Sequence, residues 1–279
     1  MKRLVSAFLA GAMALSLAAC GGAASTSTAA SASASASGSA AASQSAGSDL
    51  DYIKGKGKLV IGYTVYEPMN YTDADGNFTG FDTELATAVC EKLGVEPEFV
   101  EINWDTKVVE LDAKSIDCIW NGMTLTDDIM ANTATTKAYA KNAQVVVVKD
   151  GTDYTSTADL ADKTVVAEAG SAGEAVALEN GWNVVSVDTQ SKALMEVAAG
   201  TSDAAIIDLL MAGAMIGEGT SYPDMKLGDE LTTEEYGVGC RKDSDLASYI
   251  NDEFKKLYED GTMQKIAEQY GVQDAVVAQ

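Results

Sequence analysis

Strand-like and helix-like segments alternate along most of this chain, and this alternation limits its possible folds more than any other feature. Short runs rich in Val, Ile and Tyr predict strands, and segments with apolar residues at helical spacing predict helices. The predicted strands are residues 58–63, 98–102, 116–120, 145–148, 164–167, 183–187, 204–207 and 236–241. The predicted helices are residues 81–93, 104–111, 171–180, 189–199, 209–216, 247–257 and 263–270.

The order of these elements predicts an α/β protein built from βαβ units, in which helices cover mostly parallel sheets. The pattern occurs twice, which predicts two doubly wound lobes. The apolar run of residues 145–148 is typical of a strand that is buried on both faces. In the first helix of this pattern, Asp82 is placed to cap the beginning and Gly94 to end it.

The first 48 residues read as export and attachment signals rather than as part of the fold. Lys2 and Arg3 precede an apolar stretch that is too short to span a membrane, so residues 1–19 predict a signal peptide. The small residues before Cys20 resemble the bacterial lipoprotein signal, which implies cleavage before Cys20 and acylation of its sulfur. An ordinary secretory signal is the alternative, and it also predicts export. Residues 21–48 are almost only Ala, Ser, Thr and Gly, and they predict a disordered tether.

The composition excludes several classes of function. Without Lys2 and Arg3, 17 basic residues stand against 42 acidic ones, a formal charge of −25, so electrostatic binding of nucleic acid or anionic lipid is not expected. The chain has no His, which excludes Ser-His-Asp and Cys-His catalysis and His-ligated metals. Cys90, Cys118 and Cys240 have apolar neighbours, so we expect free buried thiols, with a single disulfide as the alternative.

Polar groups gather at the predicted carboxyl ends of four strands. Ligands of open α/β sheets bind at this edge. The polar positions are residues 63–67, 121–124 and 168–172 and Asp208. We therefore expect a ligand site to be assembled from them.

A series of short motifs runs through almost the whole body of the chain. In order, they are Lys58-Leu-Val-Ile-Gly, Tyr66-Glu-Pro68, Asp75-Gly-Asn-Phe-Thr-Gly-Phe-Asp82, Lys92-Leu-Gly94, Trp104-Asp105, Gly122-Met-Thr-Leu-Thr126, Ala169-Gly-Ser171, Gly200-Thr-Ser-Asp-Ala204, Asp208 and Asp260-Gly-Thr-Met-Gln-Lys-Ile-Ala. Together they resemble the polar-amino-acid (family 3) solute-binding proteins of ABC importers. Each motif is weak evidence, but their order and spacing over about residues 58–271 are specific.

The resemblance implies a type II fold like that of periplasmic binding proteins, in which two doubly wound lobes are joined by two hinge strands. Lobe 1 would comprise residues 49–139 and 238–279, lobe 2 residues 144–234, and the hinges residues 139–143 and 235–239. The ligand would lie in the cleft between the lobes. Closure around it would form the face that the transporter recognises.

The resemblance also assigns roles to individual residues. Asp208 would hold the ligand's α-ammonium in a charge-assisted pair, with a helix N-cap as its alternative role. Tyr66 and Trp104 would enclose the ligand's side chain between their rings, with core packing as the alternative. The candidate ligand-binding residues are Tyr66, Trp104, Asn121, Gly122, Met123, Thr124, Glu168, Ser171, Ala172 and Asp208.

Backbone groups have implied roles as well. Gly122 and Thr124 match the segment that offers a carbonyl, a hydroxyl and an N–H to the ligand. Ser171 and Ala172 open a helix whose free N–H groups would receive the ligand's carboxylate. The alternative for Ser171 is a plain N-cap.

One position departs from the family pattern. Ile129 stands where the family usually has an arginine that forks the ligand's carboxylate. Beyond the signal peptide the sole arginine is Arg241, which we expect at the surface, and lysine is not an equivalent substitute. The carboxylate could rest on backbone N–H groups alone, Lys107 or Lys137 could contribute, or the ligand could lack a carboxylate. We favour the first reading.

Glu168 adds an acid at a place where the family often has a neutral or basic residue. With Asp208, and with Glu67 as a further candidate, it favours a cationic or amine-bearing ligand such as lysine, arginine or ornithine. Tight binding of glutamate without binding of basic ligands would contradict this hypothesis.

Four polar residues, Asp73, Asp75, Asn77 and Glu84, have the spacing of a calcium-binding loop. Phe78, however, stands at the sixth place, where such a loop requires Gly. A hairpin whose turn includes Asp75 explains the same residues, and we favour it.

We expect a binding protein without a metal or a cofactor, and not an enzyme. Its expected partners are an amino-acid ligand, an ABC permease and, through the lipid anchor, the cell membrane. We expect the protein at the outer face of this membrane, which lies in the periplasm if the host has an outer membrane. We expect a monomer that binds no nucleic acid. The alternatives are a non-amino-acid amine as ligand, a dehydratase with Glu168 or Asp208 as general acid, and a receptor's sensory domain. The last would need a transmembrane helix or signalling domain, and we find neither up to Gln279.

Overall fold

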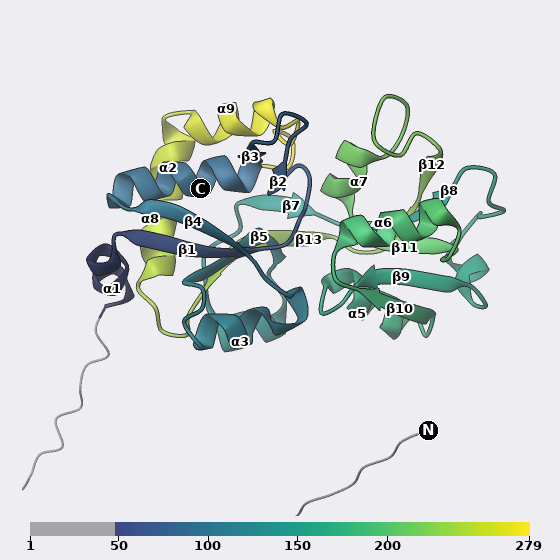
Figure 1. Ribbon diagram of the computed structural model, residues 1–279, viewed down its shortest axis with the longest axis horizontal. Coiled ribbons are helices and arrows are strands. Elements are labelled where there is room, and N and C mark those ends of the chain that lie inside the picture. Colours follow the sequence, from purple (N-terminus) through teal and green to yellow (C-terminus); the bar gives the residue numbers. More distant parts are fainter. Residues whose placement is uncertain (1–47) are drawn as a thin grey trace, which may run out of the picture. The chain divides into compact units, whose positions relative to one another are not determined.

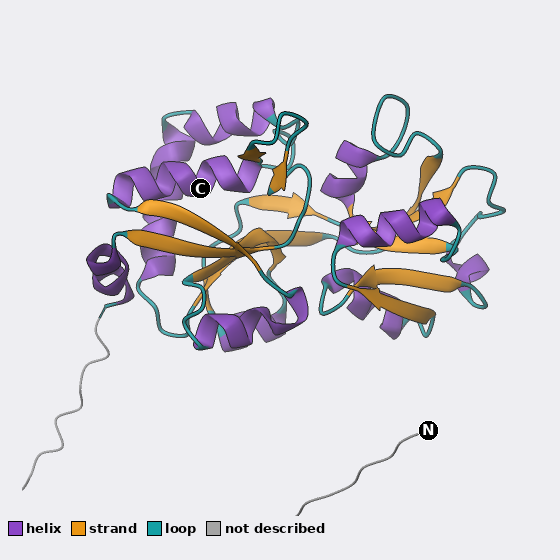
Figure 2. Ribbon diagram, in the orientation of Figure 1, coloured by secondary structure: helices purple, strands orange, loops and turns teal. Residues whose placement is uncertain are grey.

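The computed structural model describes residues 48–279, and the predicted signal peptide, the acylated Cys20 and the tether up to residue 47 lie outside the described residues. Two main sheets and their helices make up this part of the chain (Figures 1 and 2). The strands are β1 (Lys58–Tyr63), β2 (Tyr71–Thr72), β3 (Phe78–Thr79), β4 (Glu96–Glu101), β5 (Cys118–Thr124), β6 (Ala134–Thr135), β7 (Ala140–Asn142), β8 (Gln144–Lys149), β9 (Thr164–Glu168), β10 (Asn183–Val187), β11 (Ala204–Asp208), β12 (Met225–Glu230) and β13 (Glu234–Cys240). The α-helices are α1 (Asp49–Lys56), α2 (Phe81–Leu93), α3 (Lys107–Asp112), α4 (Asp127–Asn132), α5 (Ala172–Glu179), α6 (Gln190–Ala199), α7 (Leu209–Met215), α8 (Leu246–Glu259) and α9 (Thr262–Gln269), and the 3-10 helices are η1 (Trp104–Thr106) and η2 (Thr157–Leu160).

The first sheet has the order β4-β1-β5-β13-β6, with β7 also paired to β13. Successive side chains of a strand point to opposite faces of its sheet. Leu59 and Ile61 of β1 accordingly pack in the core with α2, α8 and α9, whereas Val60 between them packs in a separate core with η1 and α3. Both faces of this sheet are therefore covered, as the doubly wound prediction requires.

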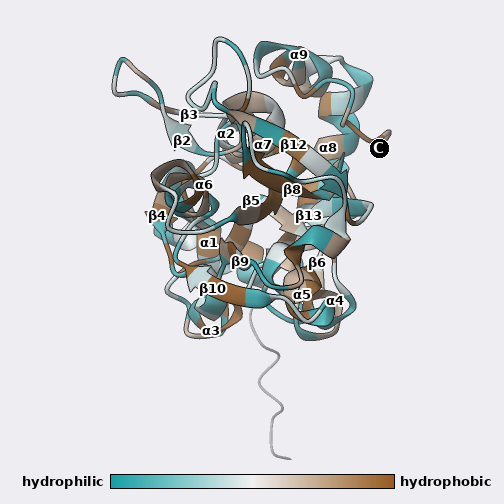
Figure 3. Cartoon of the chain, turned by 90° about the vertical axis from the view of Figure 1, so that its right-hand side faces the viewer, coloured by the Kyte–Doolittle hydropathy of each residue, from teal (hydrophilic) through white to brown (hydrophobic). Residues whose placement is uncertain are grey.

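The second sheet has the order β10-β9-β11-β8-β12 and repeats this arrangement. Val166 of β9 packs in the core that includes α6, and Val165 packs in the core that includes α5. The apolar strand β8 is buried along Gln144–Val148, which confirms the prediction of a strand buried on both faces. Figure 3 shows the hydrophobic colouring of the inner strands β5 and β8 against the mixed colouring of helices such as α9.

The sheets are mixed rather than mostly parallel, which corrects one expectation. In the first sheet β13 runs antiparallel to β5, and in the second β8 runs antiparallel to β11. A parallel strand needs a crossover connection, usually a helix. Only residue 143 separates β7 of the first sheet from β8 of the second sheet, so no crossover helix precedes β8 and sets its direction.

Most predicted elements are confirmed within a few residues, and the errors have identifiable causes. The predicted strand 116–120 is shifted, because β5 continues through the polar residues Asn121–Thr124, which pair with β13. The short helices α1 and α4 and the half-exposed strand β12 were not predicted, because their apolar residues are too few to show a period.

Asp82 does not cap α2, contrary to the prediction. The N-cap position is Gly80, where a Cβ atom would come within 2.1 Å of the Met69 carbonyl oxygen. Asp82 lies in the first turn, fully buried, and accepts hydrogen bonds from the Gly122 N–H (2.7 Å) and the Tyr139 hydroxyl (2.9 Å). Burial raises the pKa of Asp82 to about 7. At the other end Gly94 adopts the left-handed conformation and ends the helix, as predicted.

The three cysteines of the described residues are free and buried, which confirms the preferred reading of Cys90, Cys118 and Cys240. Cys118 and Cys240 face each other across β5 and β13. Among residues 48–279, no helix combines the length and the apolar character that crossing a membrane requires.

Candidate functional site

A cavity of about 170 Å³ lies where elements of the two sheets meet. The carboxyl ends of β5, β9 and β11 open onto it, in agreement with the expected position of ligand sites in α/β sheets. The residues that line it are Trp104, Lys107, Asn121, Gly122, Met123, Thr124, Thr126, Asp128, Ile129, Gln144, Glu168, Gly170, Ser171, Ala172, Ala175, Gln190 and Asp208.

Nine of the ten candidate ligand-binding residues line this cavity, and Tyr66 does not. The Tyr66 side chain is 1% exposed, and its hydroxyl lies 2.7 Å from the hydroxyl of Tyr236. A Cβ atom on Gly122 would come within 2.8 Å of the Tyr66 ring, so the ring packs beneath the cavity's floor. Tyr66 is therefore packed in the core, and its contact with a ligand stays a prediction.

Asp208 is held by three amide side chains. Its Oδ1 accepts from Asn142 Nδ2 (2.6 Å) and Gln144 Nε2 (2.5 Å), and its Oδ2 accepts from Gln190 Nε2. Asp208 occupies the N-cap position of α7, but its side chain makes no capping hydrogen bond. The carboxylate is thus oriented by side chains at the cavity rather than by the helix that follows it.

A second carboxylate, Glu234, shares these amide donors. Its Oε1 accepts from Asn142 Nδ2 (2.7 Å), Gln144 Nε2 (2.8 Å) and Thr124 Oγ1 (3.1 Å). Burial and the charge of Glu234 raise the pKa of Asp208. Two carboxylates therefore share one set of neutral donors, and a cation placed beside Asp208 would offset the repulsion between them.

Glu168 is the second acid on the cavity wall. It is 2% exposed, and its Oε1 has no hydrogen-bond partner among the described residues. Burial raises the pKa of Glu168 to about 8, and the charge of Asp208 contributes to the increase. The wall thus contains a buried acceptor atom whose hydrogen-bonding capacity is unused.

Lys107 is the one basic residue among the described residues that line the cavity. Its Nζ donates to the carbonyl oxygens of Gly170 (2.9 Å) and Trp104 (3.1 Å) and lies 4.8 Å from the centre of the Trp104 ring. Burial lowers the pKa of Lys107, and the charge of Glu168 opposes this shift. Lys137, the other lysine considered, is exposed and does not line the cavity.

The beginning of α5 forms another part of the wall. The Ser171 hydroxyl oxygen accepts the Glu174 N–H (3.0 Å), so Ser171 is the N-cap of α5, and it also lines the cavity. The Gly170 N–H donates to Glu174 Oε2 (2.7 Å). Ala172 lines the cavity at the first turn of the helix, where N–H groups point away from the helix and favour anions.

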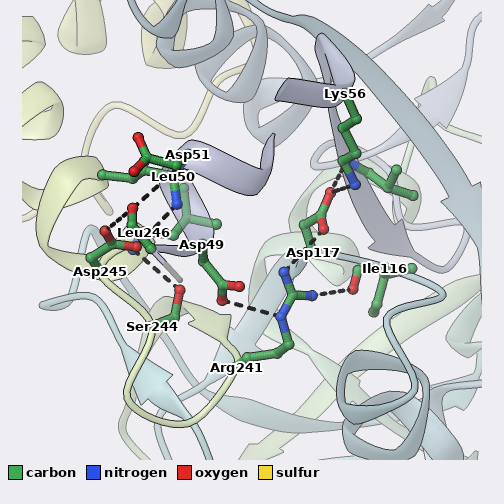
Figure 4. A network of polar contacts seen from close by, with 12 residues as sticks. Asp49, Leu50, Asp51, Lys56, Ile116, Asp117, Arg241, Ser244, Asp245 and Leu246 are labelled. Carbon is green, nitrogen blue, oxygen red and sulfur yellow. Dashed lines mark hydrogen bonds and ion pairs between the residues drawn. The ribbon is translucent and has the colours of Figure 1, made fainter. Parts of the chain in front are cut away.

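The structure corrects the expectation that Arg241 is a surface residue. Arg241 is 7% exposed and forms ion pairs with Asp49 and the fully buried Asp117, both at 3.1 Å (Figure 4). Lys56 also pairs with Asp117. Arg241 therefore ties α1 to the first sheet. Ile129 lines the cavity, and none of the described residues that line it with Ile129 is an arginine.

The remaining candidates lie away from the cavity. Glu67 is partly buried and is not among its lining residues, so the structure does not place it with Glu168 and Asp208. β2 and β3 form the predicted hairpin, and Asp73 Oδ1 accepts the N–H groups of Asp75 (2.9 Å) and Asn77 (2.8 Å). Turn geometry thus explains the residues with calcium-loop spacing.

Comparison with known proteins agrees with this geometry. Residues 59–273 match the model of the bacterial extracellular solute-binding proteins, family 3. The chain belongs to this family. The L-cystine-binding protein TcyJ of Escherichia coli (strain K12) is 29% identical over 227 residues, which are 79% of this chain and 85% of that protein. The lysine/arginine/ornithine-binding periplasmic protein of the same strain is 31% identical over 219 residues, which are 74% of this chain and 84% of that protein.

Solved structures extend the comparison to the fold. The crystal structure of a substrate-binding protein of an ABC uptake transporter from Streptococcus pneumoniae, with bound histidine, superposes with a TM-score of 0.76. It is 32% identical in sequence, and the match covers 83% of this chain and 99% of that one. This family 3 protein therefore has the type II periplasmic-binding-protein fold that the sequence motifs indicated.

In this family 3 protein, sequence reasoning missed the amides that orient Asp208. Gln144 is the first residue of β8, and Gln190 is the first residue of α6, directly after its N-cap Thr189. Both are buried, at 2% and 7% exposure. A glutamine at the end of an apolar strand is a weak signal, and nothing in the sequence shows that these two amides meet at one carboxylate.

Proposed function

We propose that this protein captures a small solute with a protonated amine, an amino acid in the simplest case, and delivers it to an ABC permease. The observation that carries the proposal is a pair of buried acids, Glu168 and Asp208, at the ends of the neighbouring parallel strands β9 and β11. Buried charges are costly unless a counter-ion accompanies them. A ligand ammonium placed between these acids provides that charge, and relatives of known ligand bind amino acids.

The ligand's other end has fewer charged partners. With Ile129 on the wall and Arg241 engaged elsewhere, we propose that a ligand carboxylate rests on the N–H groups at the beginning of α5, near Ala172. Two basic groups on the ligand would satisfy both acids at once, so lysine, arginine and ornithine are the amino acids that we expect to bind most tightly.

The experiment that tests the proposal combines native mass spectrometry with calorimetry. Native spectra of gently purified protein should show an added mass that matches a small amine. Titration of the emptied protein with basic, neutral and acidic amino acids should then give the tightest binding for a basic ligand. Binding of glutamate alone, or of sugars and not amines, would refute the proposal.

Binding of a cationic ligand should strengthen as the pH rises from about 6 to about 8. A cation favours the ionised forms of Glu168 and Asp208, whose pKa values are raised by burial, so binding releases protons. Where the pH lies below these raised pKa values, the affinity falls by about tenfold for each unit of pH decrease and each proton that binding must release. Calorimetry in buffers of different ionisation enthalpy measures both the affinity and the number of protons released.

Stability without ligand should respond to pH in the opposite direction. The pKa of Glu168 is raised from 4.5 to about 8, so the folded protein holds a proton that the unfolded chain releases within this range. The free energy of unfolding therefore falls as the pH rises from 4.5 to 8. A Glu168→Gln variant should make both profiles less steep, while Asp208 and Asp82, whose pKa values are also raised, retain part of the pH dependence. A ligand affinity that is independent of pH would contradict this assignment.

We also propose how the protein is arranged and attached. Residues 139–143 and 235–239 would act as hinges between the lobe of residues 49–139 and 238–279 and the lobe of residues 144–234. The β7 and β13 strands that pair with each other at these crossings support this division.

Cys20 would carry the lipid anchor, and a Cys20→Ser variant should be recovered free of membranes after cell fractionation. Recovery in the membrane fraction at the wild-type level would exclude this anchor.

An enzymatic role has one observation in its favour, the raised pKa of the buried Glu168, which suits a general acid at neutral pH. We propose binding instead, because a cationic ligand accounts for the same buried acids. Incubation of the bound solute with the protein, followed by mass spectrometry, separates the two. A solute recovered chemically unchanged supports binding, and a product that lacks water would establish dehydration.

A further inference from the structure

Lys107 joins two segments that are 63 residues apart in the sequence. It follows Trp104 in the segment of η1 and α3, and its ammonium reaches across to Gly170 in the turn between β9 and α5. A lysine ammonium has three N–H donors and no acceptor. Two of the three are used on main-chain carbonyl oxygens, so Lys107 retains one donor for a ligand.

The two segments are packed closely at the same place. Gly170 has a φ of +70°, and a Cβ atom there would come within 2.6 Å of the Cα atom of Asp105. Backbone on both sides therefore leaves no room for a side chain. Lys107 and Gly170 both line the cavity, together with Trp104 and Ser171.

The charges around Lys107 explain why a lysine is stable in this buried position. Glu168, Asp105, Asp128 and Glu174 all act on it electrostatically and favour its charged form. Glu168 and Asp128 also line the cavity. An ammonium at this point thus offsets part of the acidic charge of the wall while it makes charge-assisted bonds to carbonyl groups.

We propose that Lys107 is a positioning residue that fastens the turn at Gly170 onto the segment 104–107 and thereby retains the bound ligand. The bridge holds the Trp104 ring and the first turn of α5 at a fixed separation on two sides of the cavity. Loss of the bridge would loosen the contact between these two segments beside the bound ligand, so we expect it to speed dissociation. The inference rests on the proposed function, because it assumes that a solute occupies this cavity.

Stopped-flow kinetics with L-arginine as the probe tests the proposal. Lys107→Met keeps the length of the side chain and removes its donors, and it should raise the dissociation rate constant by about tenfold or more without lowering the association rate constant. Lys107→Gln, which keeps neutral donors, should recover part of the loss. Gly170→Ala should accelerate dissociation without any change of charge, because its methyl group separates the same two segments.

Lys137→Met is the matched control, since Lys137 is exposed and lies outside the cavity. An equal effect of Lys137→Met, or a Lys107→Met variant with slower association and unchanged dissociation, would overturn the proposal. Thermal unfolding of each variant shows whether it is folded, and a variant that unfolds early is replaced in the comparison by Lys107→Gln.

A readout without ligand separates this inference from the proposed function. Lys107 Nζ lies over the Trp104 ring, so Lys107→Met should change the Trp104 fluorescence, isolated by difference from Trp104→Phe variants. It should also speed hydrogen exchange of the amides of residues 170–172. If these changes occur and no amine binds, the bridge stands and the proposed function fails. If the spectra and exchange are unchanged, the bridge itself is refuted.

Discussion

Replacing Asp208 by Asn is expected to raise the Kd for a basic amino acid by about 10²- to 10³-fold. The change removes the charge that pairs with the ligand's ammonium, and truncating one partner of a buried, hydrogen-bonded charge pair costs about 2–5 kcal/mol. Each 1.4 kcal/mol corresponds to a factor of ten in Kd. In addition, three amide groups now donate to Asp208, and an Asn side chain can accept from fewer of them. Isothermal titration calorimetry measures the effect.

The control for this substitution removes the same charge elsewhere. The control is Asp188→Asn. Asp188 lies at the surface, where it pairs with Lys192, and 70% of the Asp188 side chain is exposed. This substitution should leave the Kd within about twofold, because exposed ion pairs contribute little. An Asp208→Asn protein that is folded by circular dichroism and binds as tightly as the wild type would remove Asp208 from the site. The buried pair of acids would then lose its assigned role.

Replacing Arg241 by Met should lower the free energy of unfolding by about 3 kcal/mol and leave ligand affinity unchanged. Arg241 contacts Asp117, which is fully buried, and breaking a buried ion pair leaves an uncompensated charge that costs about 3–5 kcal/mol. Lys56 remains beside Asp117, so we expect the lower end of this range. For a domain of this size, the melting temperature should fall by about 6–12 °C. Differential scanning calorimetry of both proteins gives the two values.

A surface pair provides the comparison. Lys58 and Glu98 form an ion pair at 2.5 Å with 45% and 44% of their side chains exposed. Lys58→Met should change the free energy of unfolding by less than about 1 kcal/mol. Equal destabilisation by Lys58→Met and Arg241→Met would mean that the buried network of Figure 4 contributes no more than a surface pair.

The position of the candidate cavity was predictable because it depends on where strands end. Apolar runs located β9 and β11, and the acids Glu168 and Asp208 close those runs, so both were expected at the sheet's ligand-binding edge. The same reasoning failed for Asp82 and Arg241. An Asp near the beginning of a helix reads as a cap, and an Arg after a strand reads as a surface residue, because local patterns contain no information on what packs against them.

Tyr66 illustrates the limit for aromatic side chains. A ring in the connection between two strands, as Tyr66 is between β1 and β2, can face a cleft or the core with the same sequence signal. The contact with Tyr236 from the far end of the chain placed the Tyr66 ring beneath Gly122. Likewise, the bridge from Lys107 to Gly170 depends on how two segments approach each other, which neither segment specifies alone.

Local patterns in the chain were therefore sufficient for the α/β class, for most of its elements and for the strand ends at which the acids lie, because periodicity and turn residues act over a few positions. The folded structure alone decided which polar groups became partners: the amides on Asp208, the ammonium of Lys107 on the Gly170 carbonyl, and the unused acceptor of Glu168. These pairings depend on distances between residues far apart in sequence, and such distances are set by the packing of the two sheets and their helices.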